Sequence, residues 1–169
     1  MISRRRFLVT SASASLTPFM LALEGCGAND IAALVQTLGN SASQLAALEG
    51  NTSLASKLLT DTGAAVTAID NWKSGSVATE VIEALNLVED DLNLFPITSA
   101  YVPLIDLAIA TVESIIALLP NSAAISAVHG PRRHIQLGYA PPRSAKEYTK
   151  RYNAIVVLHP SWPVSKLQN

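Results

Sequence analysis

The chain has 169 residues, of which 49% are hydrophobic and only 5% aromatic, and its apolar residues are mostly Ala, Leu, Val and Ile. This composition suffices for one domain with a helical core and argues against a β-sandwich or barrel. The net charge of −1 hides a segregation, because residues 27–120 carry two basic and eleven acidic residues, whereas residues 121–169 carry seven basic and one acidic residue. The acidic body makes nucleic acid an unfavoured partner.

Residues 1–26 have the features of an export signal. The run SRRRFL at residues 3–8 begins a weakly apolar stretch that continues to Leu23 and is diluted by Ser, Thr and Pro. That stretch is too short and too polar to be read as a membrane span. The run resembles the start of a twin-arginine signal peptide, with Val9 where that pattern has Lys. The resemblance implies export to the periplasmic side of a bacterial cell envelope. The residues that carry it are Arg4, Arg5, Phe7 and Leu8.

Cys26 is the only cysteine of the chain, and it stands at the end of this segment. The run Leu23-Glu24-Gly25-Cys26 resembles a lipobox, although Glu24 departs from the small residue usual at its position. The resemblance implies that Cys26 is lipidated, becomes the new N-terminus and anchors the protein to the membrane. The alternative is ordinary signal cleavage nearby, for instance after Gly27 or Ala28, which discards Cys26 with the signal. Neither outcome leaves a thiol for an internal disulfide.

Four amphipathic helices are predicted between residues 27 and 120, separated by Gly, Asn, Ser and Pro. The first carries a Gly39-Asn40 pair that can break it, the second is capped near Thr52 or Ser53, and Thr98 or Ser99 can cap the fourth. The predicted ranges are 30–49, 52–73, 78–95 and 98–119. The side chains predicted to be buried include Ile31, Leu34, Leu38, Leu45 and Leu48; Leu54, Leu58, Val66, Ile69 and Trp72; Ala78, Val81, Leu85, Val88, Leu92 and Phe95; and Ile105, Ala108, Val112, Ile116 and Leu119.

Short connections such as Gly50-Asn51 force sequential helices to run antiparallel, so we expect an all-α fold with an up-down four-helix bundle. The third helix has the clearest pattern, an apolar seam opposite a polar stripe that includes Glu83, Asn86 and Asp90. Its carboxylates are Glu80, Glu83 and the run at residues 89–91, and most of them are predicted to be solvated. An alternative function uses the third and fourth helices as a hairpin that inserts into a membrane, but the carboxylates at 106 and 113 make that costly.

The sequence predicts no catalytic residue, no cofactor and no metal site, and hence no enzyme. No His precedes His129, so the Glu-x-x-His pairs of di-metal bundles are absent. The chain has no Gly-x-Ser-x-Gly motif either. The three histidines, His129, His134 and His159, have no recognised ligand spacing, and we interpret them as surface residues.

Residues 121–143 read as an irregular connector containing the runs GPRRH and APPR. Ser144 and Glu147 then have capping-box spacing and begin a short helix, which ends at His159-Pro160. Its apolar face, Tyr148, Tyr152 and Ile155, is expected to dock on the bundle.

The basic end at residues 121–169 has two interpretations. It can fold back on the acidic body, or it can meet an anionic envelope surface or an acidic protein. The residues predicted to make that interaction are Arg132, Arg133, Lys146, Lys150 and Arg151. The sequence therefore favours an exported, lipid-anchored helical envelope protein with a structural or interaction role.

Overall fold

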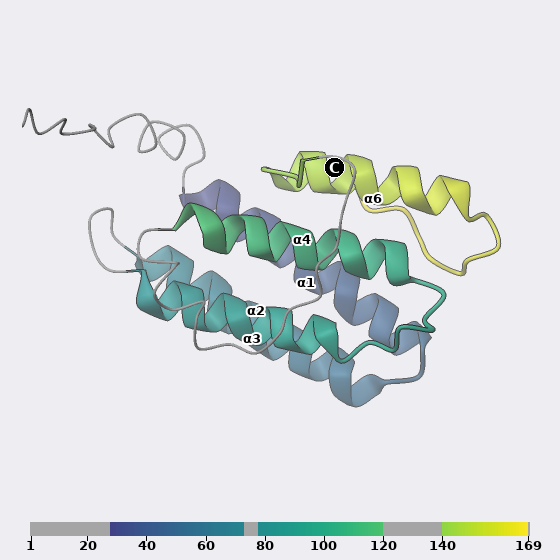
Figure 1. Cartoon of the computed structure of the whole chain (residues 1–169), viewed down its shortest axis with the longest axis horizontal. Coiled ribbons are helices and arrows are strands. Elements are labelled where there is room, and N and C mark those ends of the chain that lie inside the picture. Colours follow the sequence, from purple (N-terminus) through teal and green to yellow (C-terminus); the bar gives the residue numbers. More distant parts are fainter. Residues whose placement is uncertain (1–27, 73–77, 120–139, 169) are drawn as a thin grey trace, which may run out of the picture.

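The computed structural model describes residues 28–72, 78–119 and 140–168. These residues contain five helices and no strand, which confirms the all-α prediction (Figure 1). The helices are α1 (Ala28–Leu48), α2 (Thr52–Asn71), α3 (Thr79–Asn93), α4 (Val102–Leu118) and α6 (Ala145–Leu158).

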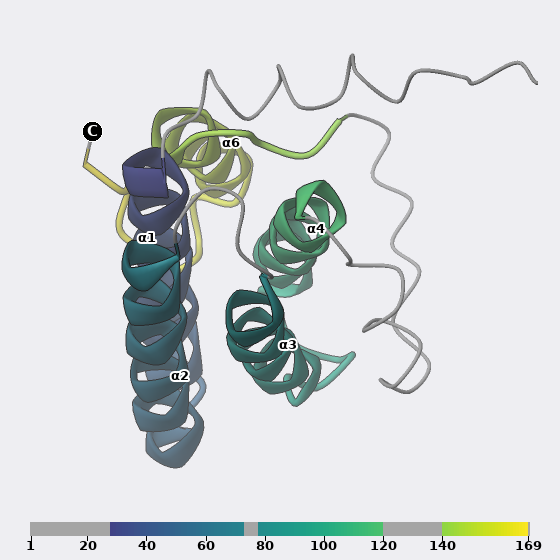
Figure 2. The same cartoon turned by 90° about the vertical axis from the view of Figure 1, so that its left-hand side faces the viewer.

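Consecutive helices pack on one another: α1 on α2, α2 on α3, and α3 on α4. In addition α1 touches α4, and α6 lies against both α1 and α4 (Figure 2). One core therefore runs through the molecule and receives side chains from all five helices. Its largest fully buried side chains include Leu34, Leu38, Leu58, Leu85, Leu104, Tyr148 and Tyr152.

The predicted seam of α3 is confirmed, because all six of its side chains are buried: Ala78, Val81, Leu85, Val88, Leu92 and Phe95. The predicted face of α4 is buried as well, yet α4 is covered more completely than an amphipathic pattern predicts. Leu104, Leu107 and Ile109 are buried in addition to the predicted residues. The physical reason is that α4 has packed neighbours on several sides, α3, α1 and α6.

The first helix is continuous through Gly39, so the expected break is not there. A Cβ atom at this position would lie 2.0 Å from the hydroxyl oxygen of Thr62 on α2. Gly39 thus lets α1 and α2 approach closely instead of ending a helix. The turn between them uses Gly50, with a φ of 78°, and Asn51, whose side chain accepts a hydrogen bond from the Leu54 amide at 3.0 Å. Asn51, rather than Thr52 or Ser53, is therefore the cap of α2.

Some expectations about individual side chains are wrong. Leu48 is 45% exposed, because it is the last residue of α1 and the chain turns away immediately after it. Asn86, which was predicted on the polar stripe of α3, is buried. Most carboxylates of α3 are exposed as predicted, namely Glu80, Glu83 and Asp90, whereas Glu89 and Asp91 are buried. Ser99 caps no helix directly; its hydroxyl accepts a hydrogen bond from the amide of Tyr101, the residue before α4.

Candidate functional site

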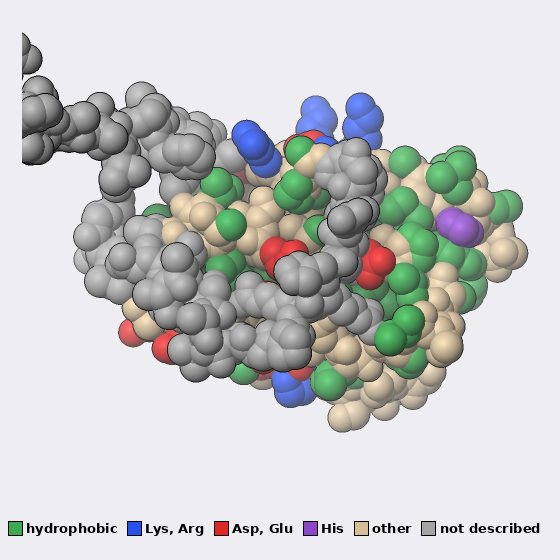
Figure 3. Space-filling view, in the orientation of Figure 1, with side chains coloured by type: hydrophobic (Ala, Val, Ile, Leu, Met, Phe, Trp, Pro, Cys, Tyr) green, Lys and Arg blue, Asp and Glu red, His purple; other side chains and the backbone are tan. Residues whose placement is uncertain are grey.

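Exposed cations follow the outer side of α6. Lys146 and Lys150 are one helical turn apart, both are exposed, and neither forms an ion pair with a described residue. Arg143, just before the helix, is exposed too. Figure 3 shows Lys and Arg side chains projecting from the edge of the molecule where α6 lies. We call Arg143, Lys146 and Lys150 the α6 basic face.

The start of α6 is fixed by the predicted capping arrangement. The Ser144 hydroxyl accepts a hydrogen bond from the Glu147 amide at 3.2 Å, and the Glu147 carboxylate accepts one from the Arg143 amide at 3.0 Å. The hydrogen bond from the Arg143 amide, together with one from the Arg151 guanidinium, lowers the pKa of Glu147. Arg151 also donates to the carbonyl of Ala140. Arg151 is therefore engaged in holding the helix start, while the two lysines point outward.

The opposite face of α6 is docked, as the pattern predicts. Tyr148 and Tyr152 are both buried, and Ile155 packs partly buried against the core. The hydroxyl of Tyr148 lies 2.9 Å from that of Ser41 on α1. Burial raises the pKa of Tyr148, and raises that of Tyr152 to about 12 with a smaller contribution from Tyr101. This buried tyrosine pair fixes the rotation of α6 and so determines which side chains face solvent.

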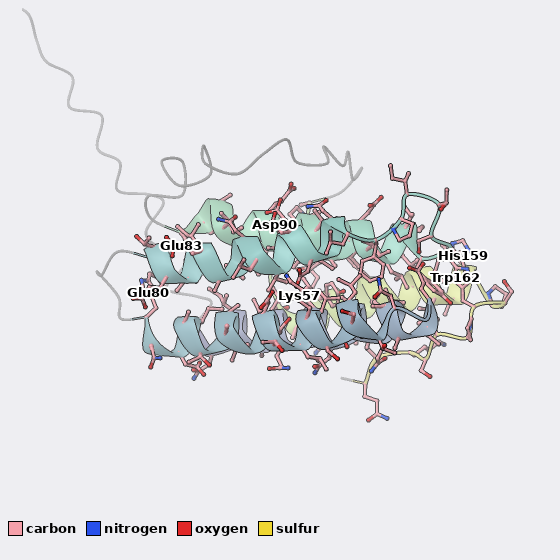
Figure 4. The ribbon with its side chains drawn as sticks, turned by 90° about the horizontal axis from the view of Figure 1, so that it is seen from below. Lys57, Glu80, Glu83, Asp90, His159 and Trp162 are labelled. Atoms are coloured by element: carbon pink, nitrogen blue, oxygen red, sulfur yellow. The ribbon has the colours of Figure 1, made fainter. Side chains whose placement is uncertain are left out.

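The segment after α6 is fastened back onto the helices. The side chain of Asn153 accepts a hydrogen bond from the Leu167 amide at 2.8 Å and donates one to the Leu167 carbonyl at 2.9 Å. Trp162 meets Tyr101 edge to face, with 5.3 Å between ring centroids, and stacks on His159 at 3.9 Å. His159 and Trp162 lie together at the end of the molecule away from Glu80 and Glu83 (Figure 4). The Asn153 contact could not be predicted from the sequence, because a single Asn forms no recognisable pattern.

Aliphatic side chains are exposed at the end of α6 as well. Val157 is 57% exposed and Leu158 76% exposed. In the neighbouring connection between α3 and α4, Leu94 and Ile97 are exposed too. The end of the molecule that contains His159 and Trp162 therefore presents apolar surface, whereas the α6 basic face lies at the start of α6.

A second cluster of charged groups joins α2 to α3. Lys57 on α2 lies 3.1 Å from a carboxylate oxygen of Asp61 and also forms an ion pair with Asp91 on α3. The hydrogen bond to Asp91 raises the pKa of Lys57, and burial raises the pKa of Asp91 although the lysine opposes this. Lys57 explains how the Asp91 carboxylate can be buried, because it supplies the opposite charge. We assign this cluster to the packing of the two helices.

The structure brings together only part of the predicted interaction set. Lys146 and Lys150 share the outer side of α6, whereas Arg151 is held by Glu147 and the Ala140 carbonyl. Seven other predicted residues lie outside the described ranges: Arg4, Arg5, Phe7, Leu8, Cys26, Arg132 and Arg133. His129 and His134 lie outside them too.

Within residues 28–72, 78–119 and 140–168, no cluster of His, Cys, Asp and Glu side chains is arranged to hold a metal ion. In the same ranges, no helix combines the length and the apolar character needed to cross a bilayer. No protein-family model, curated protein or solved structure matches this chain.

Proposed function

We propose that this protein is exported to the periplasmic side of a bacterial cell envelope, is anchored there by lipid on Cys26, and binds an anionic partner through the α6 basic face. The partner class is an anionic envelope surface or an acidic protein. The observation that carries the binding role is the position of Lys146 and Lys150, which are exposed and without an ion pair among the described residues. The proposal assigns the protein an interaction role and no reaction.

The separation of charge within the molecule supports this role. If the basic end served only to neutralise the acidic body, its lysines would pair with the carboxylates of the other helices. Instead α6 packs through its tyrosine face, and Lys146 and Lys150 point away from the core. Glu80, Glu83 and Asp90 are exposed on α3 (Figure 4). A molecule with such separated charges orients itself toward an anionic partner as it approaches.

Within this proposal α1–α4 form an up-down four-helix bundle that supports α6. The contacts between consecutive helices and the short turn at Gly50 favour this topology. The bundle gives α6 a firm base, because its Tyr148 and Tyr152 side chains are buried against it. A binding helix held in this way loses little conformational entropy when it meets a partner.

Two substitutions test the location. Replacing Arg4 and Arg5 together by Lys should leave full-length precursor in the cytoplasm, because the paired arginines carry the resemblance to a twin-arginine signal. Cys26→Ala should still be exported but should incorporate no labelled lipid and should leave the membrane fraction. Normal processing of the double-Lys precursor would refute the twin-arginine route, and a wild-type protein without lipid label would refute the anchor.

Binding is tested on a generic polyanion, dextran sulfate beads, at increasing salt. Lys146→Gln combined with Lys150→Gln should elute at lower salt than the wild type, because two charges have left the α6 basic face. The control is Glu80→Gln with Glu83→Gln, which changes two exposed charges on α3 and should bind at least as tightly as the wild type. If the lysine variant elutes with the wild type, the α6 basic face is not the binding surface.

A further inference from the structure

We propose that the α6 basic face and the exposed aliphatic side chains at the end of α6 form one continuous surface that lies on an anionic phospholipid bilayer. This inference rests on the proposed function, because it names the anionic partner of the same helix. The surface consists of Arg143, Lys146, Lys150, Val157 and Leu158, and it is called the α6 membrane face below.

The helical phase of α6 places the side chains of this surface from Lys146 to Leu158 on one side, and Arg143 precedes the helix. Lys146, Lys150, Ala154 and Val157 follow one another at spacings of four, four and three residues, and all four are exposed. Leu158 adjoins this stripe at its end and is 76% exposed. The outer side of α6 is therefore basic in its first turns and aliphatic in its last turn.

The aliphatic part distinguishes a bilayer from other anionic partners. A soluble polyanion such as an acidic polysaccharide can pair with Lys146 and Lys150, but it gains nothing from Val157 and Leu158. A bilayer takes both kinds of side chain, because lysines reach the phosphates while aliphatic groups enter the boundary between headgroups and acyl chains. The exposed Val157 and Leu158 side chains would therefore contribute to binding a bilayer, whereas they would contribute nothing to binding a soluble polyanion.

The exposed carboxylates of α3 favour the same orientation. The helices on which α6 packs are α1 and α4, and Figure 2 shows α6 beside α1 on the side away from α3. The exposed carboxylates of Glu80, Glu83 and Asp90 belong to α3. On an anionic membrane these carboxylates are repelled while the lysines of α6 are attracted, so α6 turns toward the bilayer.

The proposed lipid anchor is compatible with this orientation. α1 begins at Ala28, two residues after Cys26 in the sequence, and α6 packs on α1. A chain that leaves the bilayer at Cys26 therefore enters a helix whose neighbour is α6. The lipid and the α6 membrane face can then engage one bilayer together, and two weak attachments give a stable one.

The inference is tested by flotation of the full chain carrying Cys26→Ala, which has no lipidation site, with vesicles of equal parts phosphatidylglycerol and phosphatidylcholine. Binding to pure phosphatidylcholine vesicles measures any contribution of the apolar stretch of residues 1–26, and this background is subtracted. Lys146→Gln with Lys150→Gln should weaken binding to the anionic vesicles roughly 30-fold, since each of the two lysines contributes about half of the binding free energy that is lost. Val157→Ser with Leu158→Ser should weaken it roughly tenfold or more while leaving every charge in place.

Two controls make the result specific. Leu59→Ser with Leu87→Ser removes two exposed leucines of α2 and α3 and should bind as the wild type does. The fourfold variant Lys146→Gln, Lys150→Gln, Glu80→Gln and Glu83→Gln restores the wild-type net charge. It should still bind weakly, because binding depends on the charges of the α6 membrane face and not on the net charge. Circular dichroism of each variant should show unchanged helix content, since all substituted side chains are exposed.

The outcomes separate this inference from the proposed function. If the lysine pair matters on dextran sulfate beads and on vesicles while Val157→Ser with Leu158→Ser binds vesicles like the wild type, the bilayer inference is wrong and the partner is a soluble polyanion or acidic protein. If the lysine pair matters on neither, both proposals fail. Equal binding to both vesicle types by all variants would also overturn the inference.

Discussion

The hydroxyl of Tyr148 lies 2.9 Å from the hydroxyl of Ser41, and this contact joins α6 to α1 across 107 positions of the chain. Ser41 donates its own proton to the carbonyl of Leu38 at 2.8 Å, so Tyr148 is the donor in the contact between the helices. Tyr152, one turn later on α6, is equally buried, but its hydroxyl has no hydrogen-bond partner among the residues that the structure describes. The two buried tyrosine hydroxyls of α6 therefore contribute differently to stability, because only that of Tyr148 is hydrogen-bonded among the described residues.

Removing the two hydroxyls should therefore have opposite effects. Tyr148→Phe leaves the Ser41 oxygen with one partner fewer and should lower the free energy of unfolding by about 1 kcal/mol. Tyr152→Phe removes a buried hydroxyl that has no partner in the described part of the chain, and it should leave stability unchanged or raise it by up to about 1 kcal/mol. Urea denaturation followed by circular dichroism measures both. A loss of more than about 1 kcal/mol in Tyr152→Phe would show that its hydroxyl has a partner.

The raised pKa of Tyr152 predicts how the stability of the protein changes at alkaline pH. Tyr152 has a pKa of about 12 in the folded protein against 10.0 when unperturbed, so the unfolded chain loses this proton first. Stability due to Tyr152 is hence complete below pH 10 and is lost as the pH rises toward 12. The melting temperature should fall less steeply with pH across that window for Tyr152→Phe than for the wild type. Parallel curves for the two proteins would contradict the raised pKa.

The buried seam of α3 is tested by two neighbouring substitutions. Leu85→Ala empties a fully buried position and should lower the free energy of unfolding by about 2 to 5 kcal/mol. Glu83→Ala, two residues earlier on the exposed side, should change it by no more than about 0.5 kcal/mol. Similar urea midpoints for the two variants would mean that the rotation of α3 is wrong.

The pairing of Lys57 with Asp91 predicts a rescue. Lys57→Met leaves the buried Asp91 carboxylate without its cation and should lower the free energy of unfolding by about 2 kcal/mol. Adding Asp91→Leu to that variant removes the stranded charge and should restore most of the loss. Urea melts of the single and double variants measure the coupling. If the two substitutions simply add, Lys57 does not compensate Asp91.

Sequence pattern predicted those parts of the fold that depend on local chemistry. The seam around Leu85, the Ser144 and Glu147 capping pair and the docked face with Tyr148 all rest on spacings within one helix. These features were confirmed because a helix fixes which side chains share a face.

Contacts between helices were not predictable in the same way. The burial of Asp91 was not predicted, because its cation, Lys57, is 34 positions away on another helix. Gly39 was interpreted as a helix breaker because the close approach of Thr62 has no signature in the local sequence. Of the candidate site, the lysines of α6 were predicted, whereas the exposure of Val157 and Leu158 follows only from where α6 docks.

The position of α6 beside α1 also imposes an order on folding. During synthesis, residues 28–48 emerge long before residues 145–158. The face of α1 that contains Ser41 therefore stays uncovered until α6 has been synthesised. At ordinary elongation rates the delay over 107 positions is on the order of ten seconds. Closing so long a loop is also slower than forming the α1–α2 turn, because nonlocal contacts form late. We therefore expect docking of α6 to be the final step, with the apolar flank of α1 and α4 uncovered until then.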